Sequence, residues 1–250
     1  MPRSVLLKLL LGLGFAPGAL AAPQTIVSPV NRVHLMELYT SEGCDSCPPA
    51  ERWLSGFRDD RRLWNELVPV AFHVDYWDDL GWKDPFDSHA YTLRQQDIAA
   101  RAGDSVVYTP QFVLDGADWR NWFNHRPLNL PDPAKVGALS LSADGRAVRV
   151  HFAPGTRMAQ RLEAHVVLLA FGVNVHVGAG ENAGAVLSHD FLVVGHGQVA
   201  LSPEGGGYGA AMTLAPTSVK AARYALAAWV SAVGDPEPLQ AAGGWLAETP

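Results

Sequence analysis

Two cysteines, Cys44 and Cys47, are the only thiol-bearing residues in the 250-residue chain. They lie in the segment Thr40 to Leu54, TSEGCDSCPPAERWL, with two residues between them and two prolines directly after. A C-x-x-C pair can carry out thiol–disulfide exchange, contribute ligands to a metal site, or form a small structural disulfide. The residues around the pair favour the first of these uses.

A structural disulfide is a weak use of this spacing. Closing so short a loop stabilises the fold by only about 2 kcal/mol, compared with about 3 kcal/mol for a loop of about 15 residues. Two cysteines placed far apart along the chain would therefore stabilise it more.

A metal site needs more ligands than the pair supplies, because structural zinc takes four. The nine histidines form no second spaced pair, and His176, His189 and His196 fit positions on strand surfaces. Secreted copper chaperones combine two cysteines with a distant histidine, although three residues separate those cysteines. His73 is the corresponding third ligand here, or else a packed, hydrogen-bonded histidine at a strand end. A copper- or metal-binding accessory protein stays an alternative, and we expect no resident metal or cofactor.

Redox chemistry is favoured by the elements that flank the pair. Residues 33–40 resemble a buried strand, and residues 50–67 have helical spacing. This order places the first sulfur at a helix N-terminus, where the helix dipole favours the thiolate that attacks disulfides. We therefore expect Cys44 to attack and Cys47 to resolve the mixed disulfide.

Two features modify this expectation. Pro48 and Pro49 either delay the helix start, leaving Cys44 further from it, or both lie in its first turn, where missing N–H groups cost little. Glu42 and Asp45 flank Cys44, and nearby negative charge raises the pKa of a thiol. The acidic neighbours predict a stable disulfide with a fairly reducing potential.

Downstream residues complete the predicted site. Thr109 and Pro110 open the strand QFVLDG, which resembles the thioredoxin fold, where a cis-proline loop faces the cysteines and offers backbone groups to a peptide. We predict a cis bond before Pro110 and substrate contact at Thr109. Glu37 resembles thioredoxin's buried acid and would accept a proton from Cys47. Its alternative is an ion pair with Lys or Arg at a sheet edge.

An aromatic segment follows the second predicted strand, residues 68–74. Tyr76, Trp77 and Trp82 stand there among acidic residues. They either wall a substrate groove beside the cysteines or form a satellite core under a long loop.

The elements that must position these residues alternate β-α-β-α-β through the first half, with a second helix after Ser88. Beyond residues 128–133 the sequence pattern changes from alternating strands and helices to successive strands, and a hairpin is predicted around Asp144 and Gly145. We predict the α/β class: a thioredoxin-like domain over residues 26–130, followed by a β-rich, mostly antiparallel C-terminal domain over 134–235 and a tail over 236–250.

The first 21 residues have the basic start, apolar run and small-x-small ending of a signal peptide, which predicts a secreted or periplasmic protein. No later segment is long and apolar enough to span a bilayer. The net charge of −6 is spread along the chain without a basic stripe, so nucleic acid is not expected as a partner.

Three motifs, ELYTSEGCDSCPPAE, AFHVDYWDDLGWKDPF and YTPQFVLDG, resemble the secreted bacterial family catalogued as domain of unknown function 1223. Residues 180–193, GENAGAVLSHDFLV, resemble a later block of that family. The resemblance implies a thioredoxin-like domain and a β-rich C-terminal part, but no established activity. Three hypotheses follow: a thiol–disulfide oxidoreductase acting on a thiol or disulfide protein partner, a metal-binding accessory protein, and a non-catalytic binding module.

Overall fold

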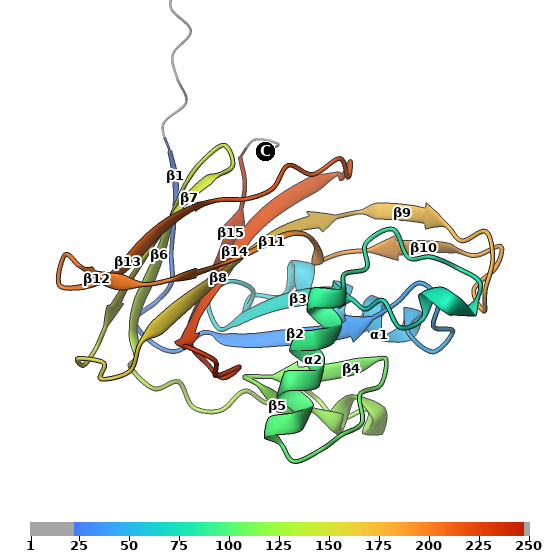
Figure 1. The fold of residues 1–250 in the computed structure, drawn as a ribbon, viewed down its shortest axis with the longest axis horizontal. Helices are drawn as coiled ribbons and strands as arrows, with labels where there is room; N and C mark the ends of the chain where they lie inside the picture. Colours follow the sequence, from blue (N-terminus) through green and yellow to red (C-terminus); the bar gives the residue numbers. More distant parts are fainter. Residues whose placement is uncertain (1–22, 248–250) are drawn as a thin grey trace, which may run out of the picture.

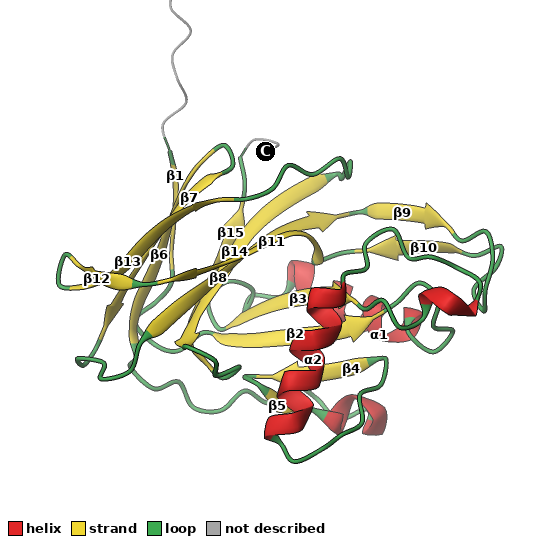
Figure 2. Cartoon of the chain, viewed as in Figure 1, coloured by secondary structure: helices red, strands yellow, loops and turns green. Residues whose placement is uncertain are grey.

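A computed structural model describes residues 23–247. It shows a β-rich body with the helices gathered at one end (Figures 1 and 2). The predicted signal peptide, residues 1–21, lies outside the described residues. Within the described residues, no helix has the length and apolar character needed to cross a membrane.

An eight-stranded sheet forms the centre of the molecule. Its strands in spatial order are β15 (Pro238–Trp245), β14 (Arg223–Ala232), β8 (Leu162–Phe171), β11 (Leu192–Ala200), β3 (Leu67–His73), β2 (His34–Thr40), β4 (Gln111–Leu114) and β5 (Ala117–Asp118). Strand β3 runs parallel to both β2 and β11, and the other neighbouring pairs are antiparallel. Strands from both halves of the chain therefore share one sheet.

The predicted fold class, an α/β thioredoxin-like domain followed by a β-rich domain, is wrong. The described residues form fifteen strands and only two α-helices, α1 (Pro48–Ser55) and α2 (His89–Arg101), so the molecule is mostly β. The prediction followed the element order of the first half. It could not foresee that β11 pairs with β3 and extends the sheet into antiparallel strands of the second half. Residues 238–245, assigned to a tail, form the edge strand β15.

A second sheet packs against one face of the first. Its five strands are β1 (Gln24–Val27), β6 (Gly137–Asp144), β7 (Ala147–Pro154), β13 (Gly207–Thr213) and β12 (Ser202–Glu204). The β6–β7 hairpin confirms the turn predicted at Asp144 and Gly145. Apolar residues of β6 and β7 share a core with Val166 of β8 and Leu226 of β14.

Strand β8 is buried on both faces. Val166 and Leu168 face the second sheet, whereas Val167 and Leu169 join the core formed with β2, β3 and α1. This double burial explains its almost continuous apolar sequence, because neither face needs polar residues.

Short elements complete the functional end. Three 3-10 helices span Gly56–Asp59, Asp78–Leu80 and Arg120–Asn124. The first follows α1, so the helical pattern over residues 50–67 yields only a short α-helix. Strands β9 (Val173–His176) and β10 (Val186–His189) form a two-stranded arm that projects from the central sheet toward α1 (Figure 1).

Candidate functional site

Cys44 and Cys47 form a disulfide in the turn between β2 and α1, with their Cα atoms 5.5 Å apart. Both residues are fully buried. Helix α1 begins at Pro48, so both prolines lie in its first turn and Cys47 is the N-cap residue. The backbone carbonyl of Cys47 accepts hydrogen bonds from the N–H groups of Ala50 and Glu51. The disulfide therefore directly precedes the helix, and the prolines remove only N–H groups that a helix leaves unpaired.

Trp77 connects the cysteine turn with the loop before β4. Its indole N–H donates to the Thr109 hydroxyl at 2.8 Å, and a Cβ added at Gly43 would lie 3.1 Å from the Cβ of Trp77. The bond between Thr109 and Pro110 is cis, as predicted. Trp77, Thr109 and Pro110 thus lie in one region with the disulfide turn.

The tip of the β9–β10 arm, residues 177–185, is attached to the same turn. The side-chain amide of Asn182 donates to the carbonyl oxygens of Glu42 and Cys44, at 2.8 and 2.9 Å. The N–H of Asp45 donates to the Glu181 carboxylate at 3.2 Å. The motif GENAG, for which the sequence indicates no chemistry, therefore holds the backbone on both sides of Cys44.

Trp82 packs between this tip and Glu42. Its indole N–H donates to Glu42 Oε2 at 2.8 Å, and a Cβ added at Gly178 or Gly180 would lie 3.1 Å from Trp82. The hydroxyl of Tyr76, in contrast, approaches Gln95 Oε1 of α2 at 3.3 Å. Trp77 and Trp82 therefore border the disulfide turn, whereas Tyr76 contacts α2.

A buried imidazole lies between two carboxylates next to α1. His189 Nδ1 is 2.5 Å from Glu51 Oε2, and His189 Nε2 is 3.0 Å from Glu42 Oε1. The Thr40 hydroxyl donates to Glu51 Oε1 at 2.7 Å. Burial alone would lower the pKa of His189, but the two carboxylates outweigh it and raise the pKa to about 10. The prediction of a surface position for His189 is wrong, because the residue is only 1% exposed.

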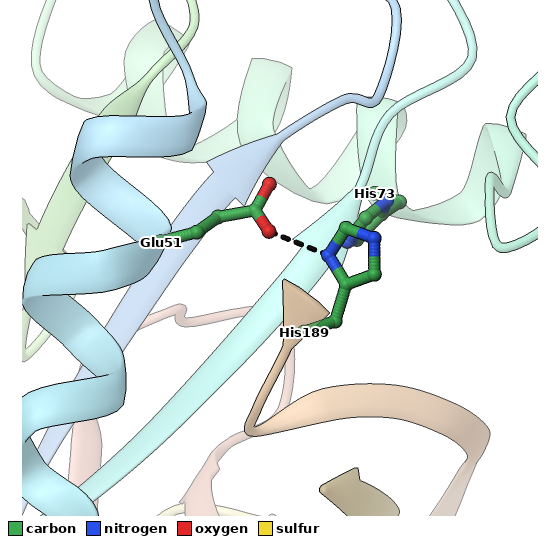
Figure 3. Close-up of side chains that lie close together, drawn as sticks. All are labelled: Glu51, His73 and His189. Carbon is green, nitrogen blue, oxygen red and sulfur yellow. Dashed lines mark hydrogen bonds and ion pairs between the residues drawn. The ribbon is translucent and has the colours of Figure 1, made fainter. Parts of the chain in front are cut away.

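A second histidine–carboxylate pair adjoins the first. His73 Nδ1 lies 2.7 Å from Asp84 Oδ2, which also accepts the backbone N–H of Glu42 at 2.8 Å. Burial would lower the pKa of His73, and the Asp84 carboxylate more than offsets this and raises it. Burial would raise the pKa of Asp84, but His73 lowers it. Figure 3 shows His73 beside His189 and Glu51.

Glu37 belongs to a different group. It accepts hydrogen bonds from Arg94 of α2, at 2.7 and 2.9 Å, and from the Tyr39 hydroxyl at 2.9 Å. Side chains alternate along a strand, so Glu37 points to the face opposite Thr40, which contacts Glu51 of α1. The structure does not bring Glu37 to the cysteine pair. Glu37 instead forms an ion pair with Arg94, which is the alternative role that the sequence left open. The pair lies within the sheet rather than at its edge, because β2 has β3 and β4 as neighbours.

A solved structure of protein AGR_C_4864 from Agrobacterium tumefaciens is similar, with 25% identity and a TM-score of 0.59, covering 88% of this chain and 97% of that one. HBP35 of Porphyromonas gingivalis shares the fold at 13% identity and a TM-score of 0.51, covering 88% of this chain and 76% of the other. Among curated proteins, none matches. The family model described as "Protein of unknown function (DUF1223)" matches residues 35–231, and the chain belongs to this family.

Proposed function

We propose that this protein carries out reversible thiol–disulfide exchange at Cys44 and Cys47 with a partner protein outside the cytoplasm. The observation that carries the proposal is that the turn is held by groups other than the disulfide. Asn182, Glu181 and Trp77 all contact it from distant segments. The turn is therefore positioned without relying on the sulfur–sulfur bond, both before a partner displaces the arm tip and after the tip returns.

The energetic weight of the bond agrees with this role. A disulfide that closes so short a loop stabilises the fold by only about 2 kcal/mol. Opening it leaves the two cores of the protein untouched, because the cysteines contribute to neither apolar cluster. A bond of this weight can open without unfolding the protein, because typical folding free energies are about 5–15 kcal/mol.

The proposed reaction consists of two successive thiol–disulfide exchange steps. In the reduced protein, the Cys44 thiolate attacks a partner disulfide, forms a mixed disulfide and releases one partner sulfur as thiolate. The Cys47 thiolate then attacks the Cys44 sulfur, closes the intramolecular disulfide and releases the second partner sulfur. Two electrons pass to the partner, and a dithiol donor of the same chemical class must restore the reduced form.

The burial of the pair means that the partner reaches it only after a cover moves. The arm tip is attached through Glu42, Cys44 and Asp45, on the Cys44 side of the turn. Cys47 instead caps α1. Displacing the tip would free Cys44 first, which supports its assignment as the attacking thiol.

Single-cysteine variants test the proposal. Cys47→Ser and Cys44→Ser are each incubated, folded, with oxidised glutathione, and mixed disulfides are followed by mass spectrometry. We expect Cys47→Ser to form the mixed disulfide faster than Cys44→Ser, because exchange rates depend on access to the attacking thiolate. Added thiol should then release the glutathione from Cys47→Ser. If neither variant reacts while folded, the exchange proposal fails.

A further inference from the structure

A group of two histidines and one carboxylate lies beside the start of α1 (Figure 3). One donor atom from each of Glu51, His73 and His189 lies within 4.8 Å of the other two. The histidines are each 1% exposed and Glu51 is 7% exposed. Two imidazoles and one carboxylate are a ligand set that first-row divalent transition metals use in proteins.

His73 has an atom without a partner in this group. Its Nδ1 contacts Asp84, but its Nε2 is buried without any hydrogen bond. Buried polar atoms are rarely left unpaired. Asp84 holds a proton on Nδ1, so Nε2 is the atom that can give up its proton to an arriving ion and present the lone pair by which imidazole binds metals.

The surroundings of the group match those of metal ligands. Metal-binding histidines usually give their second ring N–H to a carboxylate, which fixes the ring. Here Asp84 contacts Nδ1 of His73, and Glu42 contacts Nε2 of His189. The Thr40 hydroxyl likewise fixes the second oxygen of Glu51.

We propose that Glu51, His73 and His189 bind a divalent transition metal ion of the Zn²⁺ or Co²⁺ type. The ligand atoms are Glu51 Oε2, His73 Nε2 and His189 Nδ1. The Glu51 and His189 atoms, now 2.5 Å apart, separate to roughly 3–3.5 Å when the ion replaces the proton between them, since each ligand lies about 2.0–2.2 Å from the ion.

A small cavity adjoins this group at Glu51. It has a volume of about 120 Å³ and lies between α1 and β10, lined by Pro48, Glu51, Arg52, Val186, Leu187 and Ser188. Of the three ligands only Glu51 lines this cavity, so it borders the group on the Glu51 side. Neither cysteine is a ligand, so metal binding can be tested separately from the proposed thiol chemistry.

Metal binding is tested on the full mature chain with its disulfide intact, so that no thiolate is available. The protein is stripped with chelator and titrated separately with Co²⁺ and Zn²⁺, using visible absorption for Co²⁺, calorimetry for Zn²⁺, and Mg²⁺ as the negative probe. We expect one tightly bound ion per chain, Co²⁺ d–d bands, and affinity at least about 100-fold weaker in His73→Gln and in His189→Gln.

His34→Gln is the matched control. His34 is also buried, pairs with an aspartate, Asp115, and has an unpartnered Nε2. It belongs to no group of metal-ligating residues within residues 23–247. This variant should bind the ion as the unaltered protein does.

Nitrogen-15 NMR of the unaltered protein gives a second readout that does not depend on the variants folding. On adding Zn²⁺, the Nε2 signal of His73 and the Nδ1 signal of His189 should move to metal-bound shifts, while His34 stays fixed. The proposal is overturned if no ion binds above the Mg²⁺ background, or if an ion binds without moving these two signals.

Discussion

The side-chain amide of Asn182 lies 2.9 Å from the carbonyl oxygen of Cys44, although 138 residues separate them in sequence. The same amide also donates to the carbonyl of Glu42. These two hydrogen bonds fasten the tip of the β9–β10 arm to the disulfide turn. A residue from the second half of the chain therefore helps to hold the turn that carries the disulfide.

Replacing Asn182 with alanine should make the disulfide easier to reduce. Loss of two hydrogen bonds weakens the attachment of the tip by about 1–2 kcal/mol, which is a factor of about 5–30 in the open population. The rate of reduction by a water-soluble phosphine, followed by thiol alkylation and mass spectrometry, should rise by that factor. Asn174→Ala, an exposed position on the same arm, should keep the original rate. Equal rates in both variants would contradict the assignment of the tip as a cover.

Removing the charge of Glu37 should affect stability and leave the redox potential unchanged. Glu37→Gln breaks the ion pair between the buried Glu37 carboxylate and the mostly buried Arg94 guanidinium, and the loss of one partner of a buried pair costs about 3–5 kcal/mol. Glu237→Gln removes a largely exposed carboxylate from its ion pair with Arg32, and it should cost under about 1 kcal/mol. Chemical denaturation measures both. A potential shifted by more than about 30 mV in Glu37→Gln would instead return Glu37 to the thiol chemistry.

Two other histidines should make the fold sensitive to acid. His165 and His196 contact one another at 3.2 Å, and Arg94 lies near both. Burial first, and then the Arg94 charge, lower the pKa of His165 to about 2 and that of His196 to about 4. The neighbouring carboxylate of Glu163 lies 3.8 Å from His165.

The sign of this effect follows from proton uptake by the unfolded chain. Above a pH of about 6.5 both histidines are neutral in either state, and they contribute no pH dependence. Below it the unfolded chain binds protons that the folded protein refuses, so stability falls as the pH falls. Each histidine contributes up to about 1.4 kcal/mol per pH unit, down to its folded pKa.

Chemical denaturation between pH 6.5 and 4.5 should show the free energy of unfolding falling with pH. In His196→Gln this fall should be smaller by the contribution of one histidine. His151→Gln, a half-exposed histidine of β7, should leave the slope unchanged. An identical slope in His196→Gln and the unaltered protein would refute the buried, neutral state of His196.

Local features of the first half were accessible from the sequence because they depend on neighbouring residues. The strand ending at Thr40, the strand near His73 and the cis bond at Pro110 all follow from short patterns of apolar residues and proline. Family membership was visible for the same reason, since it rests on contiguous motifs.

The fold class and the buried network depended on contacts between distant segments. Nothing local to β11 indicates that it pairs with β3, and nothing local to His189 indicates that Glu42 and Glu51 surround it. The sequence left two roles open for Glu37 for a related reason: the partner, Arg94, comes from α2, and nothing local to the strand indicates it. The motif GENAG was the one sequence signal at the arm tip, but it did not indicate that Glu181 and Asn182 contact the disulfide turn.

The equilibrium of the folded protein with a glutathione redox buffer tests the central claim most directly. The fraction of Cys44–Cys47 disulfide is measured by alkylation and mass spectrometry, from both the oxidised and the reduced starting states. Burial of both cysteines disfavours the thiolates of the reduced form. The account predicts one reversible two-electron transition with a potential nearer about −270 mV than the about −120 mV of strong periplasmic oxidants. A disulfide that opens only when circular dichroism shows unfolding would contradict it.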